Sequence, residues 1–107
     1  MKRFGMVIGL KPEAEREYRE HHAAVWPEVL DRIRQCIIRN YSIYLKDGML
    51  YSYFEYYGAD FEADMAKMAA DPATQRWWAL MEPMQNPVAT RKAGEWWAAM
   101  EEVFHLD

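Results

Sequence analysis

The sequence YREHHAAVWPE, residues 18–28, lies in the first long helical pattern of the chain and organises everything around it. Apolar or ring-bearing residues recur at three- and four-residue intervals from about Glu13 to Ile37, the spacing of a helix with one buried face. Tyr18 and His22 are four residues apart on that face, so one ring stands above the other. A buried phenol or imidazole needs a polar partner, because leaving it unpaired costs about 1–3 kcal/mol.

Two environments would supply partners for these rings. One is a core hydrogen bond to a backbone carbonyl, and the other is a pocket between helix and sheet in which a polar ligand meets both rings. Pro27 removes a helical hydrogen bond, so we expect the helix to kink or restart near Trp26. The kink would free backbone carbonyls around Ala23, beside His22. From this helix alone, the structural and the functional interpretation both stay open.

Composition limits the class of protein. The chain has 107 residues, 51% of them hydrophobic, which predicts one domain, residues 1–107, with a sizeable core. The net charge of −4 comes from intermixed acids and bases without a basic run, which argues against a nucleic-acid partner. No apolar run approaches the roughly 20 residues of a membrane span. The single cysteine, Cys36, rules out an internal disulfide, and we expect a cytoplasmic protein with no membrane partner.

Residues 4–10 predict a first strand. The charged start and short apolar run resemble a signal peptide, but the run is too short and lacks a cleavage pattern. Alternate residues from Phe4 to Leu10 would face the core. Gly5 and Gly9 share the opposite face with Val7, and the two glycines leave room there for close packing or for another chain.

Residues 40–57 contain the clearest local signal, two strand-like runs that flank the turn pair Asp47-Gly48. A two-residue loop would place Tyr41 opposite Phe54 and give the hairpin one core-like face, with the hydroxyl of Tyr41 at its end. The other face, called the tyrosine face below, is aromatic and polar together. Its residues are Ser42, Tyr44, Lys46, Met49, Tyr51, Tyr53 and Glu55. Such a face is typical of protein contacts, so we predict that it is a homodimer surface.

Two further helices are predicted, at residues 60–70 and from Asp71-Pro72 to about Gln85, where Asp is the cap and Pro the first helical residue. Neighbouring helical positions point about 100° apart, so one of Trp77 and Trp78 can face the core while the other covers an adjacent edge. The pair is explained by a bulky core or by a sugar pocket, in which indoles stack on ring C–H groups. Spacing alone favours the core.

The order of elements predicts an α+β fold. Residues 86–95 form the longest irregular stretch, of the kind that often covers a site, and residues 100–106 would be a last strand. The succession strand, helix, strand, strand, helices, strand is the ferredoxin-like split β-α-β arrangement, an antiparallel sheet with helices on one face. A second copy would cover the open face, as in proteins of the dimeric α/β-barrel type.

The inventory of reactive groups favours acid–base chemistry without a cofactor. The chain has no Gly-rich phosphate loop and no paired-Cys or HExxH metal motif, and the adjacent His21 and His22 point apart on a helix, so we predict no metal and no cofactor. A neutral imidazole with a pKa of about 6.5 can give and take protons. The candidate groups are the imidazole of His22, the hydroxyls of Tyr18 and Tyr41, and the indoles of Trp77 and Trp78.

Four motifs together resemble the L-rhamnose mutarotase family: YxxxHxxxWPE at 18–28, NYxIY at 40–44, QRWW at 75–78 and EVFH at 102–105. The resemblance implies a small cytoplasmic homodimer that interconverts the α and β anomers of L-rhamnose, an isomerase without metal or nucleotide. The family's proton donor falls on His22, and its sugar-binding residues fall on Tyr18, Tyr41, Trp77 and Trp78. Ala23-Ala24 departs from the family pattern, in which a polar residue or proline is common at this place.

Anomer exchange fits these groups. A proton must reach the ring oxygen while another leaves the C1 hydroxyl; the ring opens, the C1–C2 bond rotates and the ring closes on the other face. Our hypothesis is that His22 protonates the ring oxygen and that a tyrosine or a bound water receives the C1 proton. One well-placed acid–base residue contributes typically about 10²–10⁴-fold. Trp77 and Trp78 would stack on the sugar and on its C6 methyl.

Two other functions compete with this one. A cofactor-free monooxygenase of the dimeric α/β-barrel type would use an apolar pocket for an electron-rich aromatic substrate, and oxygen consumption with a quinol would favour it. A non-catalytic ligand-binding dimer module would use Tyr18 and His22 for binding only. Replacement of His22 would then leave sugar turnover untouched, because none exists.

Overall fold

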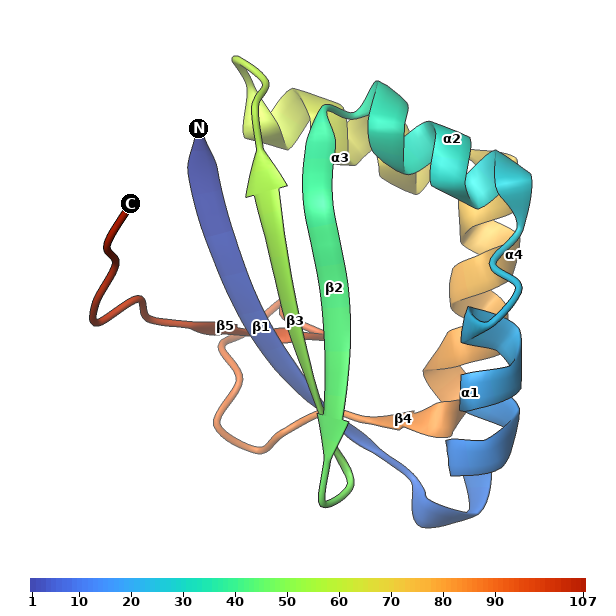
Figure 1. Ribbon diagram of the computed structural model, residues 1–107. Coiled ribbons are helices and arrows are strands. Elements are labelled where there is room, and N and C mark those ends of the chain that lie inside the picture. Colours follow the sequence, from blue (N-terminus) through green and yellow to red (C-terminus); the bar gives the residue numbers. More distant parts are fainter.

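Three long strands make most of the sheet in this computed structural model, which describes residues 1–107 (Figure 1). They are β1, Lys2–Leu10, β2, Ile38–Lys46, and β3, Met49–Tyr56. Two short strands, β4, Gln85–Asn86, and β5, Ala98–Met100, pair with the free edge of β1. The order is therefore β2-β3-β1-β4, with β5 also on β1, and every pair is antiparallel. The predicted α+β, ferredoxin-like arrangement is confirmed.

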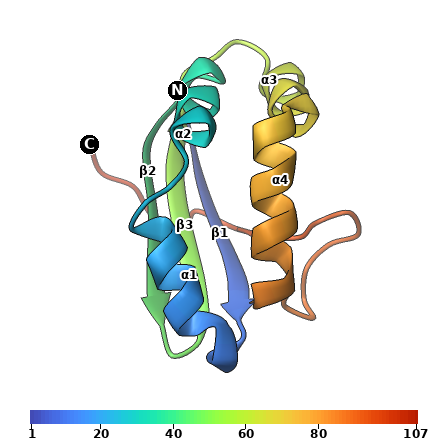
Figure 2. The same cartoon turned by 90° about the vertical axis from the view of Figure 1, so that its right-hand side faces the viewer.

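Four α-helices cover one face of the sheet. They are α1, Glu15–His22, α2, Pro27–Gln35, α3, Phe61–Ala70, and α4, Pro72–Met81. Figure 2 shows α1 and α2 in one row and α4 in a second row beside them, both in front of the strands. None of these helices has the length and apolar character needed to cross a membrane. The opposite face of the sheet carries no helix (Figure 1).

The long helical pattern from Glu13 to Ile37 is divided into two helices. A 3-10 turn, η1, Pro12–Ala14, leads into α1, and α1 ends at His22. Trp26 has an extended backbone, with φ −58° and ψ 132°, because the residue before a proline is disfavoured in the helical region. Pro27 then begins α2, where its missing N–H costs nothing. The helix was expected to kink or restart near Trp26, and it restarts: α1 ends at His22 and α2 begins at Pro27.

Aspartate caps begin α3 and α4. The Asp60 side chain accepts a hydrogen bond from the Ala63 amide at 3.1 Å, and the Asp71 side chain accepts one from the Thr74 amide at 3.0 Å. The last helix, α4, ends at Met81, before the predicted limit at Gln85, and continues as a 3-10 turn, η2, Glu82–Met84. Pro83 in this turn cannot donate an α-helical hydrogen bond.

The hairpin has the predicted two-residue turn but a bulge at its far end. Lys46 lies opposite Met49, as a two-residue loop requires. The register then shifts between Arg39 and Ser42, so Tyr41 and Phe54 are not a regular ladder pair as predicted, although their rings still lie together with centroids 5.4 Å apart. Asn40 takes up the extra residue with a left-handed φ of 51°, which Asn tolerates better than most side chains.

The predicted last strand at residues 100–106 was also wrong. β5 ends at Met100, and residues 101–107 are exposed and have no regular structure. A strand needs a neighbour for its backbone hydrogen bonds, and this segment pairs with none in the chain. Its contact with the sheet is an ion pair between Arg3 Nε and Glu102 Oε1 at 2.9 Å. Three apolar side chains of the segment are 79–92% exposed: Val103, Phe104 and Leu106.

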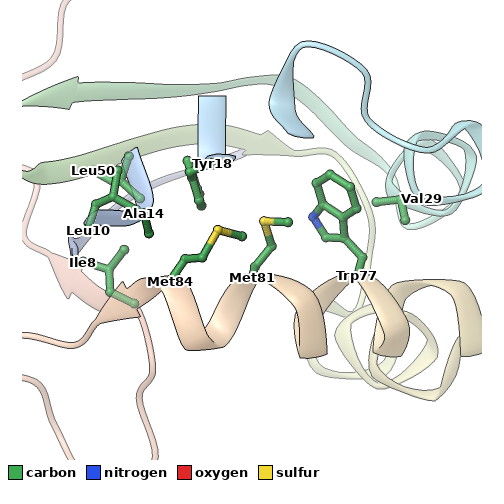
Figure 3. Close-up of a cluster of buried hydrophobic side chains, with 9 residues drawn as sticks. All are labelled: Ile8, Leu10, Ala14, Tyr18, Val29, Leu50, Trp77, Met81 and Met84. Atoms are coloured by element: carbon green, nitrogen blue, oxygen red, sulfur yellow. The ribbon is translucent and has the colours of Figure 1, made fainter. Parts of the chain in front are cut away.

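The main core lies between the sheet and the two rows of helices (Figure 3). Trp77, Met81 and Met84 project from the α4–η2 segment into it, as predicted for one of the two tryptophans. The other members come from β1, η1, α1, α2 and β3: Ile8, Leu10, Ala14, Tyr18, Val29 and Leu50. Tyr18 and Trp77 are the two large rings of this cluster that also reach a cavity.

Candidate active site

A cavity of about 820 Å³ opens between the α1–α2 segment and the edge strand β2. This volume falls in the range of small-molecule sites. Tyr18 and His22 of α1, Tyr41 of β2 and Trp77 of α4 all line it, so the fold brings together residues that are up to 59 positions apart in the chain, from Tyr18 to Trp77. The rest of the wall is mainly aliphatic and includes no Asp or Glu.

His22 lies at the C-terminal end of α1 because the following residues leave the helix. Its Nδ1 is 2.9 Å from the Tyr18 carbonyl oxygen. A carbonyl only accepts, so Nδ1 carries the proton of the neutral ring and Nε2 keeps a free lone pair. The ring stacks on Tyr18 with a centroid separation of 4.1 Å and meets the edge of Trp77 at 5.4 Å. Both environments considered from the sequence therefore occur together, the carbonyl at Nδ1 and the cavity beside the ring.

Burial between the two aromatic rings lowers the pKa of His22 below its ordinary 6.5. The hydrogen bond to the Tyr18 carbonyl opposes this shift, and the neighbouring His21 charge adds to it. The lowered pKa favours the neutral imidazole near pH 7. In that state Nε2 is a proton acceptor.

Tyr18 is 4% exposed, and its burial raises the pKa of its phenol. The hydroxyl oxygen accepts a long hydrogen bond, 3.5 Å, from the side-chain amide Nε2 of Gln85. Gln85 Oε1 in turn accepts from the indole Nε1–H of Trp96 at 2.8 Å. No acceptor within the chain takes the hydroxyl proton of Tyr18, so this proton is available to a ligand.

Tyr41 is oriented differently from Tyr18. The Tyr41 residue is 42% exposed and lines the cavity. Burial of the hydroxyl, with a smaller effect from the nearby Tyr18 phenol, raises the pKa of Tyr41 to about 12. Both phenols therefore keep their protons at neutral pH and can donate hydrogen bonds.

The two adjacent tryptophans are separated by the helix. Trp77 is 6% exposed and packs edge-on against Trp26, with ring centroids 5.1 Å apart. Trp78 is 39% exposed and lies outside the cavity wall, so the structure does not gather it with the other predicted site residues. His21 also lies outside the wall, with Nε2 3.4 Å from the Glu17 carboxylate.

Gln85 and Trp96 are site residues that the sequence analysis missed. Gln85 falls at the predicted end of a helix and Trp96 directly after the predicted irregular stretch 86–95, and neither has a periodic pattern that would link it to Tyr18. The only sequence signal was the length of the irregular stretch, of the kind that often covers a site. No group of three or more His, Cys, Asp or Glu side chains is placed to hold a metal ion.

A split β-α-β sheet with an imidazole and two protonated phenols around one cavity defines a small-molecule-binding domain equipped for proton transfer. A model of the L-rhamnose mutarotase family matches residues 3–106. The chain belongs to the L-rhamnose mutarotase family, as the motifs of its sequence predicted.

Individual relatives agree with this assignment. The chain is 32% identical to the L-rhamnose mutarotase of Oceanobacillus iheyensis and 30% identical to that of Bacillus subtilis strain 168, in both cases over 100% of each chain. The crystal structure of an L-rhamnose mutarotase from Formosa agariphila superimposes with a TM-score of 0.77 over 100% of both chains. At 20% identity, this last comparison supports the fold.

Proposed function

We propose that this protein is an isomerase that interconverts the α and β anomers of L-rhamnose. Membership in the family supports the reaction. The observation that carries the chemistry is the position of His22: its Nδ1 is held by the Tyr18 carbonyl, and its ring lines a cavity that Tyr18 and Tyr41 also line. These groups can exchange protons with both oxygens of a hemiacetal.

The predominant protonation states suggest which group starts the reaction. Neutral His22 would accept the C1 hydroxyl proton at Nε2, while a phenol, which keeps its proton, donates to the ring oxygen. The C1–O5 bond breaks, the aldehyde forms, and the C1–C2 bond rotates. On closure the protonated His22 donates to the aldehyde oxygen and the phenol recovers its proton from O5, so His22 acts as base and as acid in turn.

This order of events reverses the roles in the hypothesis drawn from the sequence, in which His22 protonates the ring oxygen and a tyrosine or a bound water receives the C1 proton. A tyrosine that received the C1 proton would have to be ionised first, and the raised pKa values of Tyr18 and Tyr41 oppose ionisation. We therefore assign a tyrosine to the donating role: it is protonated at the start and transfers its proton to the ring oxygen only as the C1–O5 bond breaks. Trp77 would supply an apolar surface for the sugar, and Trp78, outside the wall, remains a prediction from the sequence.

We also propose a homodimer that buries the tyrosine face, and a cytoplasmic location. Tyr44, 65% exposed, and Tyr51, 39% exposed, are paired across β2 and β3 and alternate with Leu45 and Leu50, which pack in the core, so they point to the other side of the sheet. The C-terminal segment, residues 101–107, adjoins this face: a hollow there is lined by Gly5 and Tyr53 together with Phe104 and His105. Apolar side chains that are this exposed in a single chain favour burial against a second copy.

Saturation-transfer NMR on the anomeric protons of equilibrated L-rhamnose tests the activity. Saturation of one anomer should reach the other faster with protein than without it, and His22→Ala should abolish this gain. His21→Ala removes the adjacent imidazole outside the cavity and should keep it. Oxygen consumption with a quinol, together with no sugar exchange, would instead favour the monooxygenase, and binding without exchange would favour the ligand-binding module.

A further inference from the structure

A chain of three side chains runs from the irregular segment between β4 and β5 to the cavity. Trp96 lies in that segment and donates its indole N–H to Gln85 Oε1 at 2.8 Å. Gln85 is 6% exposed, is held in β4 opposite Leu10, and places its Nε2 3.5 Å from the Tyr18 hydroxyl. An exposed loop residue is thereby connected to the hydroxyl of Tyr18, a residue that lines the cavity.

The indole fixes the orientation of the amide. Indole Nε1–H is a donor only, so the amide atom that faces Trp96 must be the oxygen. A flipped amide would set its NH₂ group against the indole N–H, donor against donor. The NH₂ group must then face Tyr18, whose oxygen accepts and whose own hydrogen is directed elsewhere. The cavity is the remaining place for that hydrogen, because no protein acceptor takes it.

We propose that Gln85, oriented by Trp96, is a positioning residue that directs the hydroxyl hydrogen of Tyr18 into the cavity. This inference rests on the proposed function, in which that hydrogen is donated to an oxygen of the sugar. Of the two phenols, Tyr18 is then the one whose hydrogen-bond direction is set in advance by the protein. Setting it in advance avoids a reorientation during the reaction.

The critical experiment replaces Gln85 by residues of similar size that either remove or reverse this hydrogen bond. Gln85→Met provides no donor and leaves the Tyr18 hydroxyl free to rotate. Gln85→Glu, at pH 8, has two acceptor oxygens, one for the Trp96 indole and one for the Tyr18 hydroxyl. The second of these would turn the hydroxyl hydrogen away from the sugar.

We expect kcat/KM for anomer exchange to fall about 3- to 10-fold in Gln85→Met, the range of one hydrogen bond. The kcat/KM of Gln85→Glu should fall further than that of Gln85→Met, mainly through kcat, although glutamate keeps the shape and polarity of glutamine. Trp96→Phe, a change at a half-exposed position, should lie between wild type and Gln85→Met because the amide can then flip. A Gln85→Glu variant as active as wild type, or more active than Gln85→Met, overturns the proposal.

A second measurement does not depend on activity. The ¹³Cζ resonance of Tyr18, assigned by its loss in Tyr18→Phe, reports the hydrogen bonding of the phenol. It should move in Gln85→Met and move differently in Gln85→Glu; an unchanged resonance in both would show that Gln85 does not act on Tyr18. If wild type shows no exchange of L-rhamnose, the proposed function fails, and this resonance still tests the role of Gln85.

Discussion

His22 serves the protein in two ways that have different physical requirements. Its Nδ1 hydrogen bond to the Tyr18 carbonyl stabilises one tautomer and one ring orientation. Its stacking between Tyr18 and Trp77 removes water and lowers its pKa. The hydrogen bond leaves Nε2 free and the loss of water keeps the ring neutral, and together they give the state that a base needs.

The lowered pKa of His22 predicts a pH dependence of stability. Below an unfolded-state pKa of about 6.5, the unfolded chain binds a proton that the folded chain resists, so the free energy of unfolding should fall as pH decreases. The stability that neutral His22 contributes is fully present above the unfolded-state pKa. It is lost progressively as the pH falls from there to the lower pKa of the folded state. Thermal melting between pH 5 and 8 should show this slope in wild type and a smaller slope in His22→Gln. Equal slopes in both proteins would contradict the lowered pKa.

Tyr18→Phe should weaken sugar binding more than it disturbs the fold. The change removes a hydroxyl but keeps the ring in the core, and the main cost is the Gln85 amide left without its acceptor, about 1–2 kcal/mol. We expect KM for L-rhamnose to rise about 10-fold, with a small decrease in Tm. A large loss of thermal stability with unchanged KM would assign Tyr18 a structural role instead.

The elements of the fold position these residues through two local devices. Pro27 breaks the first helical stretch and leaves His22 at a helix end beside the cavity. The short strand β4 then holds Gln85 against β1 at Gly9 and Leu10. The effect of the proline could be predicted from the sequence, whereas β4 could not, because two residues carry no alternating pattern.

Gly9→Ala should disturb β4 and through it the site. A Cβ at Gly9 would lie 2.5 Å from the Asn86 carbonyl oxygen, too close for the backbone of β4 to stay in place. Gly5→Ala is the matched control on the same strand, since its Cβ would meet the flexible Met100 side chain at 3.3 Å. We expect a lower Tm and a lower kcat/KM for Gly9→Ala and a clearly smaller effect on both for Gly5→Ala. Equal effects would show that β4 does not depend on this close approach.

At the scale of the whole molecule, the sheet has one face covered by helices and one face left open. The open face combines exposed tyrosines with the C-terminal segment, whose apolar side chains have no cover in one chain. The sequence predicted a strand in that segment because its residue types suit one. Pairing, however, needs a neighbour that a single copy of the chain does not offer.

The proposed homodimer predicts a mass change that can be measured directly. Size-exclusion chromatography with light scattering should give twice the mass of the 12.7 kDa chain. Tyr51→Asp places a charge in the centre of the tyrosine face and should shift the protein toward the monomer. Arg16→Asp, on an exposed turn of α1 away from this face, should leave the mass unchanged. A monomeric wild type, or a dimeric Tyr51→Asp that melts like wild type, would exclude this interface.

The sequence by itself determined the elements whose signals are local. Helical periodicity, the Asp71-Pro72 start and the Asp47-Gly48 turn are set by neighbouring residues, and the family motifs placed Tyr18, His22, Tyr41 and Trp77 among the site candidates. Only the tertiary structure decided that Trp77 reaches the cavity while Trp78 does not. It also decided that Trp96 and Gln85 form a hydrogen-bonded chain to the Tyr18 hydroxyl. These choices depend on contacts between residues far apart in the chain, and no local pattern encodes which side chains will meet.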